Sequence, residues 1–133
     1  MEHKGFTLIE LMIAVVIVAI LGSIAVPSYF SYVRDSRRDL AKQSLLAAAQ
    51  KMESYYALNM TYVGSATGTS PDIFTDKVPA DGTERYYTLQ ISDLTQSGYT
   101  LSAVPQGTQT SDSCGTLALT RAGAKTPTTT GCW

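Results

Sequence analysis

The stretch GFTLIELMIAVVIVAILGSIAVP, residues 5–27, combines a long apolar run with one carboxylate, Glu10, close to its start. The run from Phe6 to Val26 is interrupted only by Thr7, Glu10, Gly22 and Ser23. A helix over these positions would be about 31 Å long, which is the thickness of the hydrocarbon core of a bilayer. The sequence therefore predicts one membrane-spanning helix at residues 6–27.

Glu10 is the unexpected residue of this segment. A carboxylate placed in the core of a bilayer costs about 2.5–3.5 kcal/mol on insertion scales. We therefore expect Glu10 to have a partner. The alternative is that its side chain snorkels to the lipid headgroups at the end of the span.

The residues before the apolar run do not form an ordinary secretory signal. The charged piece MEHKG is five residues long, and no A-x-A-like cleavage site follows the run before Pro27. If a leader is removed, the natural break follows Gly5.

The string KGFTLIELMIAVVIVAILGSIAVPSY resembles the class III signal and N-terminal helix of type IV pilins and of the related type II secretion pseudopilins. The resemblance implies a leader at residues 1–5, cleavage between Gly5 and Phe6 by a prepilin peptidase, and N-methylation of the new Phe6 amine. Glu10 matches the acidic residue of the family that pairs with the N-terminal amine of a neighbouring subunit. Glu10 would then set the register between subunits, as a lone polar residue does in a coiled coil.

Residues 29–58 continue with a helical pattern. One face is predicted to carry Val33, Leu40, Ser44, Leu45, Ala48, Met52, Tyr55 and Tyr56, and the opposite face Arg34, Asp35, Arg38, Lys42 and Glu53. Pro27 removes a backbone hydrogen bond and is expected to bend the helix. Gly22 to Pro27 is therefore a predicted weak point. The resemblance implies that it loses helicity in a filament, and a simple kink is the alternative.

The rest of the chain predicts an antiparallel sheet. Turn-forming residues dominate residues 64–82, and three alternating segments follow at residues 85–91, 98–104 and 114–123. Three or four strands with one apolar face need a cover, which the helix face through Leu45, Ala48, Met52 and Tyr55 supplies. The predicted fold is α+β: a long N-terminal helix, hydrophobic in its first half and amphipathic in its second, packed on a small sheet in a soluble head at residues 28–133.

Cys114 and Cys132 are the two cysteines of the chain. They lack C-x-x-C spacing and a nearby histidine, so they predict a disulfide rather than a metal site. Closing a loop of about 19 residues would stabilise the fold by about 3 kcal/mol. The pair indicates an oxidising compartment, either the periplasm or the cell exterior.

The last twenty residues, CGTLALTRAGAKTPTTTGCW, resemble the C-terminal strand and closing C-W of minor pilins of the PilE type. The resemblance implies a structural subunit of an extracellular filament, with other pilin subunits, the prepilin peptidase, the membrane and an inner-membrane assembly platform as partners. The precursor would lie in the inner membrane with its head in the periplasm. The alternatives are a type II secretion pseudopilin and a pilus-tip or DNA-uptake pilin.

Little in the sequence supports catalysis or a cofactor. The single histidine, His3, lies in the predicted leader, and no phosphate loop or paired-carboxylate motif is present. Asp72, Asp76, Asp81 and Glu84 are close in sequence but lack the spacing of a calcium loop. Asn59-Met60-Thr61 matches a three-residue glycosylation sequon, a short motif that is common by chance.

The charge balance argues against a nucleic-acid partner without excluding one. After Pro27 the chain carries nine Lys and Arg against nine Asp and Glu. Beyond the helix, Lys77, Arg85, Arg121 and Lys125 face six acids, which is a poor electrostatic footprint for DNA. Tyr86 and Tyr87 are expected to be strand and core residues rather than platforms for stacked bases.

Overall fold

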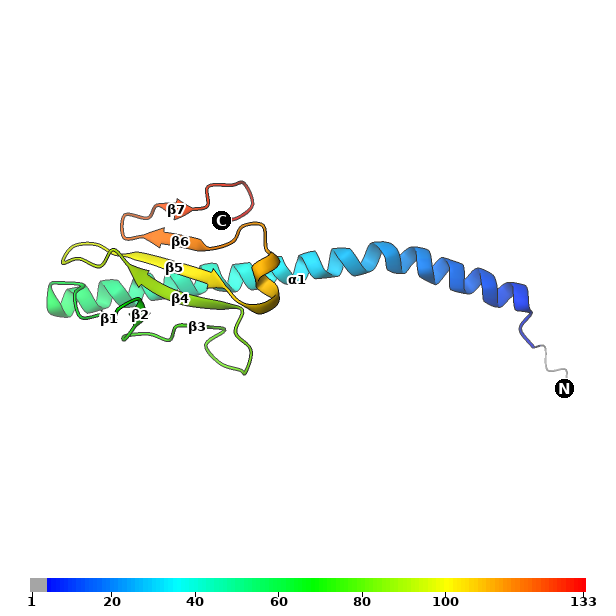
Figure 1. Cartoon of the computed structure of the whole chain (residues 1–133), viewed down its shortest axis with the longest axis horizontal. Coiled ribbons are helices and arrows are strands. Elements are labelled where there is room, and N and C mark those ends of the chain that lie inside the picture. Colours follow the sequence, from blue (N-terminus) through cyan, green and yellow to red (C-terminus); the bar gives the residue numbers. More distant parts are fainter. Residues whose placement is uncertain (1–4) are drawn as a thin grey trace. The chain divides into compact units, whose positions relative to one another are not determined.

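The structure is a computed structural model that describes residues 5–133, and it is built on helix α1, Leu8–Asn59 (Figure 1). His3 and the remainder of residues 1–4, most of the expected leader, lie outside the described residues. The chain divides after Val33 into an N-terminal unit and a head, Arg34–Trp133.

In the N-terminal unit, α1 is helical from Leu8 onward and continues through Gly22 and Pro27. Proline has no amide N–H, so the carbonyl of Ser23 lacks its usual donor four residues on. The hydroxyl of Ser23 donates to the carbonyl of Ile20 at 2.7 Å. The predicted apolar helix is confirmed. Loss of helicity at Gly22–Pro27 on assembly stays a prediction.

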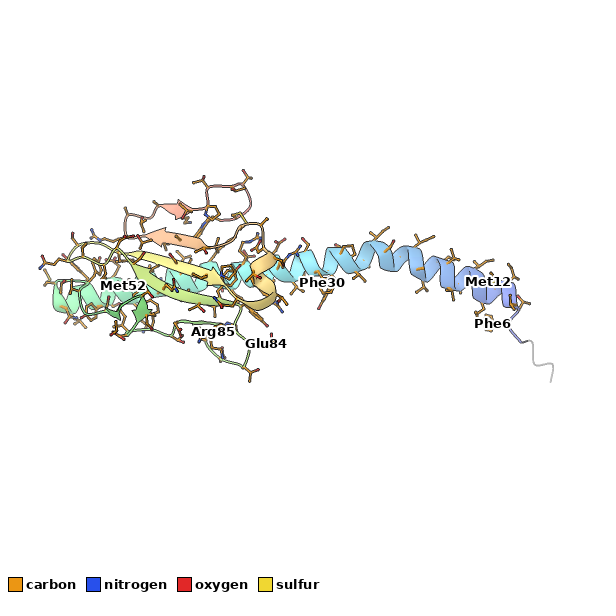
Figure 2. The ribbon with its side chains drawn as sticks, in the orientation of Figure 1. Phe6, Met12, Phe30, Met52, Glu84 and Arg85 are labelled. Atoms are coloured by element: carbon orange, nitrogen blue, oxygen red, sulfur yellow. A yellow bond between two sulfur atoms is a disulfide. The ribbon has the colours of Figure 1, made fainter. Side chains whose placement is uncertain are left out.

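The side chains of this unit are uncovered. Phe6 and Met12, labelled in Figure 2, are 91% and 53% exposed. Among residues 5–133, α1 is the one helix long and apolar enough to cross a membrane. Its exposed apolar surface therefore needs a cover of lipid or of other protein chains.

Within the described residues, the main sheet of the head has five antiparallel strands in sequence order (Figure 1). They are β3, Lys77–Val78; β4, Tyr87–Ser92; β5, Thr100–Pro105; β6, Leu117–Thr120; and β7, Lys125–Thr126. A separate hairpin pairs β1, Ala66–Thr67, with β2, Ser70–Pro71. The α+β fold is confirmed. The expected three or four strands become five because β3 and β7 are too short to produce a period.

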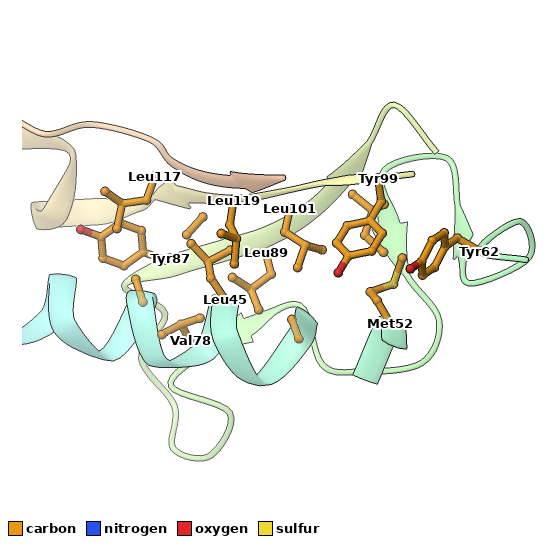
Figure 3. Packing of buried hydrophobic residues seen from close by; sticks show 14 residues of the cluster. Leu45, Met52, Tyr62, Val78, Tyr87, Leu89, Tyr99, Leu101, Leu117 and Leu119 are labelled. Atoms are coloured by element: carbon orange, nitrogen blue, oxygen red, sulfur yellow. The ribbon is translucent and has the colours of Figure 1, made fainter. Parts of the chain in front are cut away.

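The core lies between α1 and one face of this sheet (Figure 3). Alternate strand residues point inward, as the sequence predicts: Tyr87, Leu89 and Ile91 on β4, Leu101 and Ala103 on β5, and Leu117 and Leu119 on β6. Ala41, Leu45, Ala48 and Met52 cover them from α1. Tyr62 and Tyr99 close one end of the core beside Met52, and Tyr87 and Leu117 lie at the other end.

The predicted helix face is partly wrong. Leu40 is 39% exposed, whereas Arg38, which the pattern places on the polar face, is 9% exposed. The buried positions 38, 41, 45, 48 and 52 follow one stripe at spacings of three and four. Arg38 lies at the N-terminal end of this stripe, where the side chain of Asp112 and the carbonyl of Gly131 cover it, and Leu40 lies outside the stripe.

We expect Leu45→Ala to destabilise the head by about 2–5 kcal/mol, because Leu45 is fully buried and its removal leaves a cavity. The matched control is Leu46→Ala, because Leu46 is 48% exposed, and we expect it to cost less than about 1 kcal/mol. Denaturant unfolding of the full chain in detergent, followed by the fluorescence of the single tryptophan Trp133, measures both. Equal destabilisation by the two variants would contradict the packing described here.

Candidate functional site

The start of α1 places Glu10 against Thr7. The Glu10 carboxylate accepts hydrogen bonds from the backbone N–H and the hydroxyl of Thr7, each at 2.8 Å, and the Thr7 hydroxyl accepts one from the Glu10 amide at 3.3 Å. This reciprocal pairing is a capping box, which satisfies free N–H groups at the helix N-terminus. In the single chain, the partner of Glu10 is therefore the end of its own helix.

The predicted cleavage site lies just before this capping box. Gly5 and Phe6 precede α1 and are both exposed, and a Cβ at Gly5 would meet no atom within 4 Å. The peptide bond between them is therefore open to a protease. Cleavage there would leave a free amine on Phe6, one residue before Thr7.

The two cysteines form the predicted disulfide. Cys114 and Cys132 are bonded, with their Cα atoms 5.6 Å apart, and they close a loop that contains β6 and β7. Cys132 is buried, and Cys114 packs against the core. The C-terminal part of the head is thus tied to the segment that enters β6.

A buried ion pair, which the sequence pattern misses, secures the same loop. Arg38 donates from Nε and Nη2 to the two carboxylate oxygens of Asp112, at 2.8 and 2.5 Å. Its Nη1 also donates to the carbonyl of Gly131 at 3.2 Å, and Asp112 accepts from the amide of Cys114. Both ends of the disulfide loop are therefore bound, directly or through Asp112, to one arginine of α1.

Tyr87 and Gln109 complete the network. The Tyr87 hydroxyl donates to Asp112 at 3.2 Å, and the Gln109 amide donates to Tyr87 at 2.9 Å and to the Arg34 carbonyl at 3.0 Å. The sequence does contain a signal for the burial of Arg38. This residue precedes Ala41 by three positions and Leu45 by seven, which places it on the same stripe of the helix.

The pKa values in this network reflect burial and pairing. Burial alone would raise the pKa of Asp112, but its hydrogen bonds with Arg38, the Cys114 amide and Tyr87, together with the positive charge of Arg38, outweigh this effect and hold the pKa below its ordinary value of 3.8. Burial raises the pKa of Tyr87 to about 12. At neutral pH the network therefore consists of a carboxylate, a guanidinium and a neutral phenol.

The four head cations considered for DNA binding all have partners. Arg85 pairs with Asp76 at 2.9 Å, and the Lys77 ammonium donates to the carbonyl of Gly82. Arg121 donates to the Tyr62 hydroxyl at 2.9 Å, and the Lys125 ammonium lies 5.1 Å from the centre of the Trp133 ring.

A fifth cation, Arg37 of α1, is not among the four that the sequence suggests. Its guanidinium stacks 4.0 Å above the ring of Tyr86 and donates to Thr108 at 3.0 Å. These side chains, Arg85 and the carboxylate of Glu84 line a groove of about 320 Å³. Tyr87 is a core residue as predicted, whereas Tyr86 presents its ring to Arg37.

Two of the four acids considered for calcium have other partners. Asp72 accepts a hydrogen bond from Thr67 at 2.8 Å, and Asp76 pairs with Arg85. Residues 5–133 contain no group of three or more His, Cys, Asp or Glu side chains placed to hold a metal ion. The Asn59 side chain donates to the carbonyl of Tyr55 at 2.9 Å.

Comparison with known proteins gives two family matches. Residues 1–26 match the prokaryotic N-terminal methylation motif, and residues 27–118 match the family described as type IV minor pilin ComP, DNA uptake sequence receptor. The fold and both matches define a type IV pilin, which is a structural protein rather than an enzyme. Within that class, the chain belongs to the type IV minor pilin ComP family.

Individual relatives agree with this class. The chain is 39% identical to a fimbrial protein of Pseudomonas aeruginosa over 94 residues, covering 68% of this chain and 60% of that protein. It is 47% identical to the type IV major pilin PilE of Neisseria gonorrhoeae over 56 residues, covering 41% of this chain and 32% of that protein. The chain thus spans about three fifths of the first relative's length and about a third of the second's.

Solved structures show the same fold. A type IV pilin from Shewanella oneidensis aligns with a TM-score of 0.55 at 32% identity, covering 75% of this chain and 97% of that chain. The non-core minor pilin PilV of Neisseria meningitidis aligns with a TM-score of 0.53 at 25% identity, covering 71% and 86%. The predicted resemblance to type IV pilins is confirmed.

We expect Asp112→Asn to destabilise the head by about 3 kcal/mol, because it removes the buried counter-charge of Arg38 and leaves only the exposed carboxylate of Asp35, 3.1 Å away. The matched control is Asp39→Asn, which breaks the exposed pair with Lys42 and should cost about 0–1 kcal/mol. Folding lowers the pKa of Asp112 from its ordinary value of 3.8. The stability that its carboxylate contributes is therefore present above pH 3.8 and is lost as the pH falls through the lowered pKa. Denaturant unfolding at pH 7 and pH 3 tests this, and a pH-independent difference between wild type and Asp112→Asn would contradict it.

Proposed function

We propose that this chain is a minor subunit of a type IV pilus. The observation that carries the proposal is the apolar N-terminal part of α1, whose large side chains are exposed. Lipid chains cover such a surface while the subunit is in a membrane. Packed helices of neighbouring subunits replace the lipid in a filament.

The proposed pathway begins with a precursor in the inner membrane, its head in the periplasm. Prepilin peptidase cleaves between Gly5 and Phe6, and the new amine of Phe6 is methylated. The exposure of both residues and the match to the N-terminal methylation motif support this step. An assembly platform then moves the subunit into an extracellular filament. The pilin relatives and the disulfide favour this pathway over that of a type II secretion pseudopilin.

In the proposed filament, Glu10 exchanges partners. In the single chain its carboxylate accepts two hydrogen bonds from Thr7, both on Oε2, and these leave its negative charge uncompensated. The cationic N-terminal amine of a neighbouring Phe6 supplies that charge, which matters most where lipid and apolar helices exclude water. Glu10 thereby favours one axial offset between subunits over all others.

Gly22 and Pro27 are proposed to let α1 adapt on assembly. Pro27 leaves the carbonyl of Ser23 without a helical donor, and glycine disfavours helix by about 1 kcal/mol relative to alanine. A Cβ at Gly22 would meet no atom within 4 Å, so packing within the chain does not require glycine there. We infer that glycine is needed there in the filament, because the helix unwinds locally at this position on assembly.

We expect Glu10→Gln to insert in the membrane normally but to enter filaments at least about tenfold less efficiently than wild type. Glutamine preserves the capping box with Thr7 while removing the charge, so the variant separates the two roles of this side chain. Quantitative immunoblotting of sheared filaments against the membrane fraction measures the ratio. Glu10→Ala, which removes both roles, is the comparison, and normal incorporation of the glutamine variant would show that only the capping box matters.

A second candidate function is DNA binding by the head. It is favoured by the ComP family match over residues 27–118 and by the groove in which Arg37 and Arg85 lie beside Tyr86. Guanidinium groups contact phosphates, and an aromatic ring beside them offers a stacking surface. The near-neutral net charge of the head predicts that such binding depends on these few residues rather than on a broad basic surface.

If the head binds duplex DNA, we expect Arg37→Gln/Arg85→Gln to reduce the slope of log affinity against log salt concentration by about two, one for each phosphate that is no longer neutralised. The control is Lys42→Gln/Lys51→Gln, which removes the same charge elsewhere on α1. Fluorescence anisotropy of a labelled duplex with the full chain in detergent, at several salt concentrations, gives both slopes. An equal effect of the two double variants would assign binding to net charge, and no binding by wild type would exclude this function.

A further inference from the structure

Three aromatic side chains lie on α1 just beyond its apolar run. Tyr29, Phe30 and Tyr32, here called the aromatic band, are 64%, 57% and 72% exposed. Phe30 is labelled in Figure 2, and the rings of Tyr29 and Phe30 meet edge to face with their centres 6.0 Å apart. Residues 8–26, in contrast, include no aromatic residue. Aliphatic and aromatic side chains are therefore segregated along this helix.

The aromatic band occupies one side of α1. At about 100° per residue, its three side chains fall within an arc of about 160° of the helix circumference. Ser28 and Ser31, the two serines of the same turn, fall outside this arc. All five side chains are exposed within the part of the chain that the structure describes, so the band is open to contact with a second molecule.

The length of the apolar run places the band relative to a bilayer. Residues 8–26 form about 29 Å of helix, which fills a hydrocarbon core of about 30 Å. The Cα atoms of Tyr29 and Tyr32 then lie about 5 Å and about 9 Å beyond the core, measured along the helix. Helical side chains lean toward the N-terminus, which here is back toward the core. The rings of a spanning helix would therefore lie in the headgroup layer, which is about 5–8 Å thick on each side of the core.

The charges next to the band agree with this depth. No charged residue lies between Glu10 and Arg34. Arg34 and Asp35 follow Tyr32 by two and three residues, where a spanning helix reaches water. Asp35 pairs with Arg38 at 3.1 Å, so its negative charge is compensated within the chain. The first charge past the band is thus the Arg34 guanidinium, whose sign suits the phosphates of the headgroup layer.

We propose that the aromatic band binds the headgroup layer of the membrane and fixes the depth of the spanning helix. This inference rests on the proposed function, because it concerns the membrane stage of the subunit. A tyrosine ring is apolar and its hydroxyl is polar, so this side chain suits the boundary between hydrocarbon and water. Phe30 adds apolar area on the same side of the helix. Aliphatic residues would serve equally well in a contact between helices, so the change to aromatic residues at this position selects lipid as the partner.

The test measures the depth of single tryptophans in the full chain, reconstituted in phosphatidylcholine vesicles. Trp133→Phe removes the native tryptophan but keeps a ring beside Lys125, and Tyr29→Trp or Ile17→Trp then adds one in the band or at the middle of the span. Bromine atoms on the lipid chains quench a tryptophan only on contact. We expect bromine near the headgroup to quench position 29 at least about threefold more than bromine near the chain ends, and we expect the reverse at position 17.

A second measurement asks whether the band holds the helix at its depth. Tyr29→Ser/Tyr32→Ser, in the chain that carries Ile17→Trp, removes the two amphipathic rings. We expect it to reduce the ratio of deep to shallow quenching at position 17 at least about twofold, because the helix is then free to slide along the bilayer normal. The matched control is Ser28→Ala/Ser31→Ala, which changes the same turn outside the band and should leave the ratio unchanged.

The outcomes separate this proposal from the proposed function. Quenching of position 29 by neither lipid, or more by deep than by shallow bromine, would overturn the proposal alone if position 17 is quenched as expected. An unchanged ratio in Tyr29→Ser/Tyr32→Ser would also overturn it. Quenching of position 17 by neither lipid would show that the apolar helix does not enter the bilayer, and it would overturn the membrane stage of the proposed function as well.

Discussion

The exposed apolar surface of the first part of α1 determines the environments in which this protein can exist. Its large side chains are more than half exposed almost throughout, and each square ångström of apolar surface left in water costs about 25 cal/mol. The chain therefore cannot exist as an ordinary water-soluble monomer. It needs a cover of lipid or of other helices, and we propose that it meets these in turn, first in a membrane and then in a filament. The head, in contrast, has its own core.

The head uses polar contacts where its core ends. Arg38 binds Asp112 and the carbonyl of Gly131, and the disulfide between Cys114 and Cys132 closes the same segment. A buried ion pair is often no more stabilising than apolar residues of the same volume, but its hydrogen bonds have strict geometry. We infer that Arg38 fixes where the C-terminal loop lies against α1, while the disulfide restricts the loop when the head unfolds.

Much of this molecule can be predicted from the sequence, because its signals are long or regular. The apolar helix, the inward residues of β4, β5 and β6, and the disulfide follow from hydrophobic run length, alternation and cysteine count. Strands of two residues, such as β3 and β7, are too short to show the alternation of apolar and polar residues that identifies a strand. The sequence pattern places Arg38 on the polar face because a charged residue is normally exposed. Its burial depends on a partner, Asp112, that lies 74 residues away in the sequence. The sequence also contains the T-x-x-E motif of a capping box, Thr7 to Glu10. It therefore offers Glu10 a partner within its own chain as well as one on a neighbouring chain.

We propose that the chain is matured at Phe6 and assembled through its N-terminal helix. The most direct measurement is the mass of the N-terminal peptide of this chain, taken from filaments sheared from the cell surface. We expect a peptide that begins at Phe6 and carries one added methyl group on its amine. A peptide that begins at Met1, or recovery of the chain from membranes but never from filaments, would contradict it.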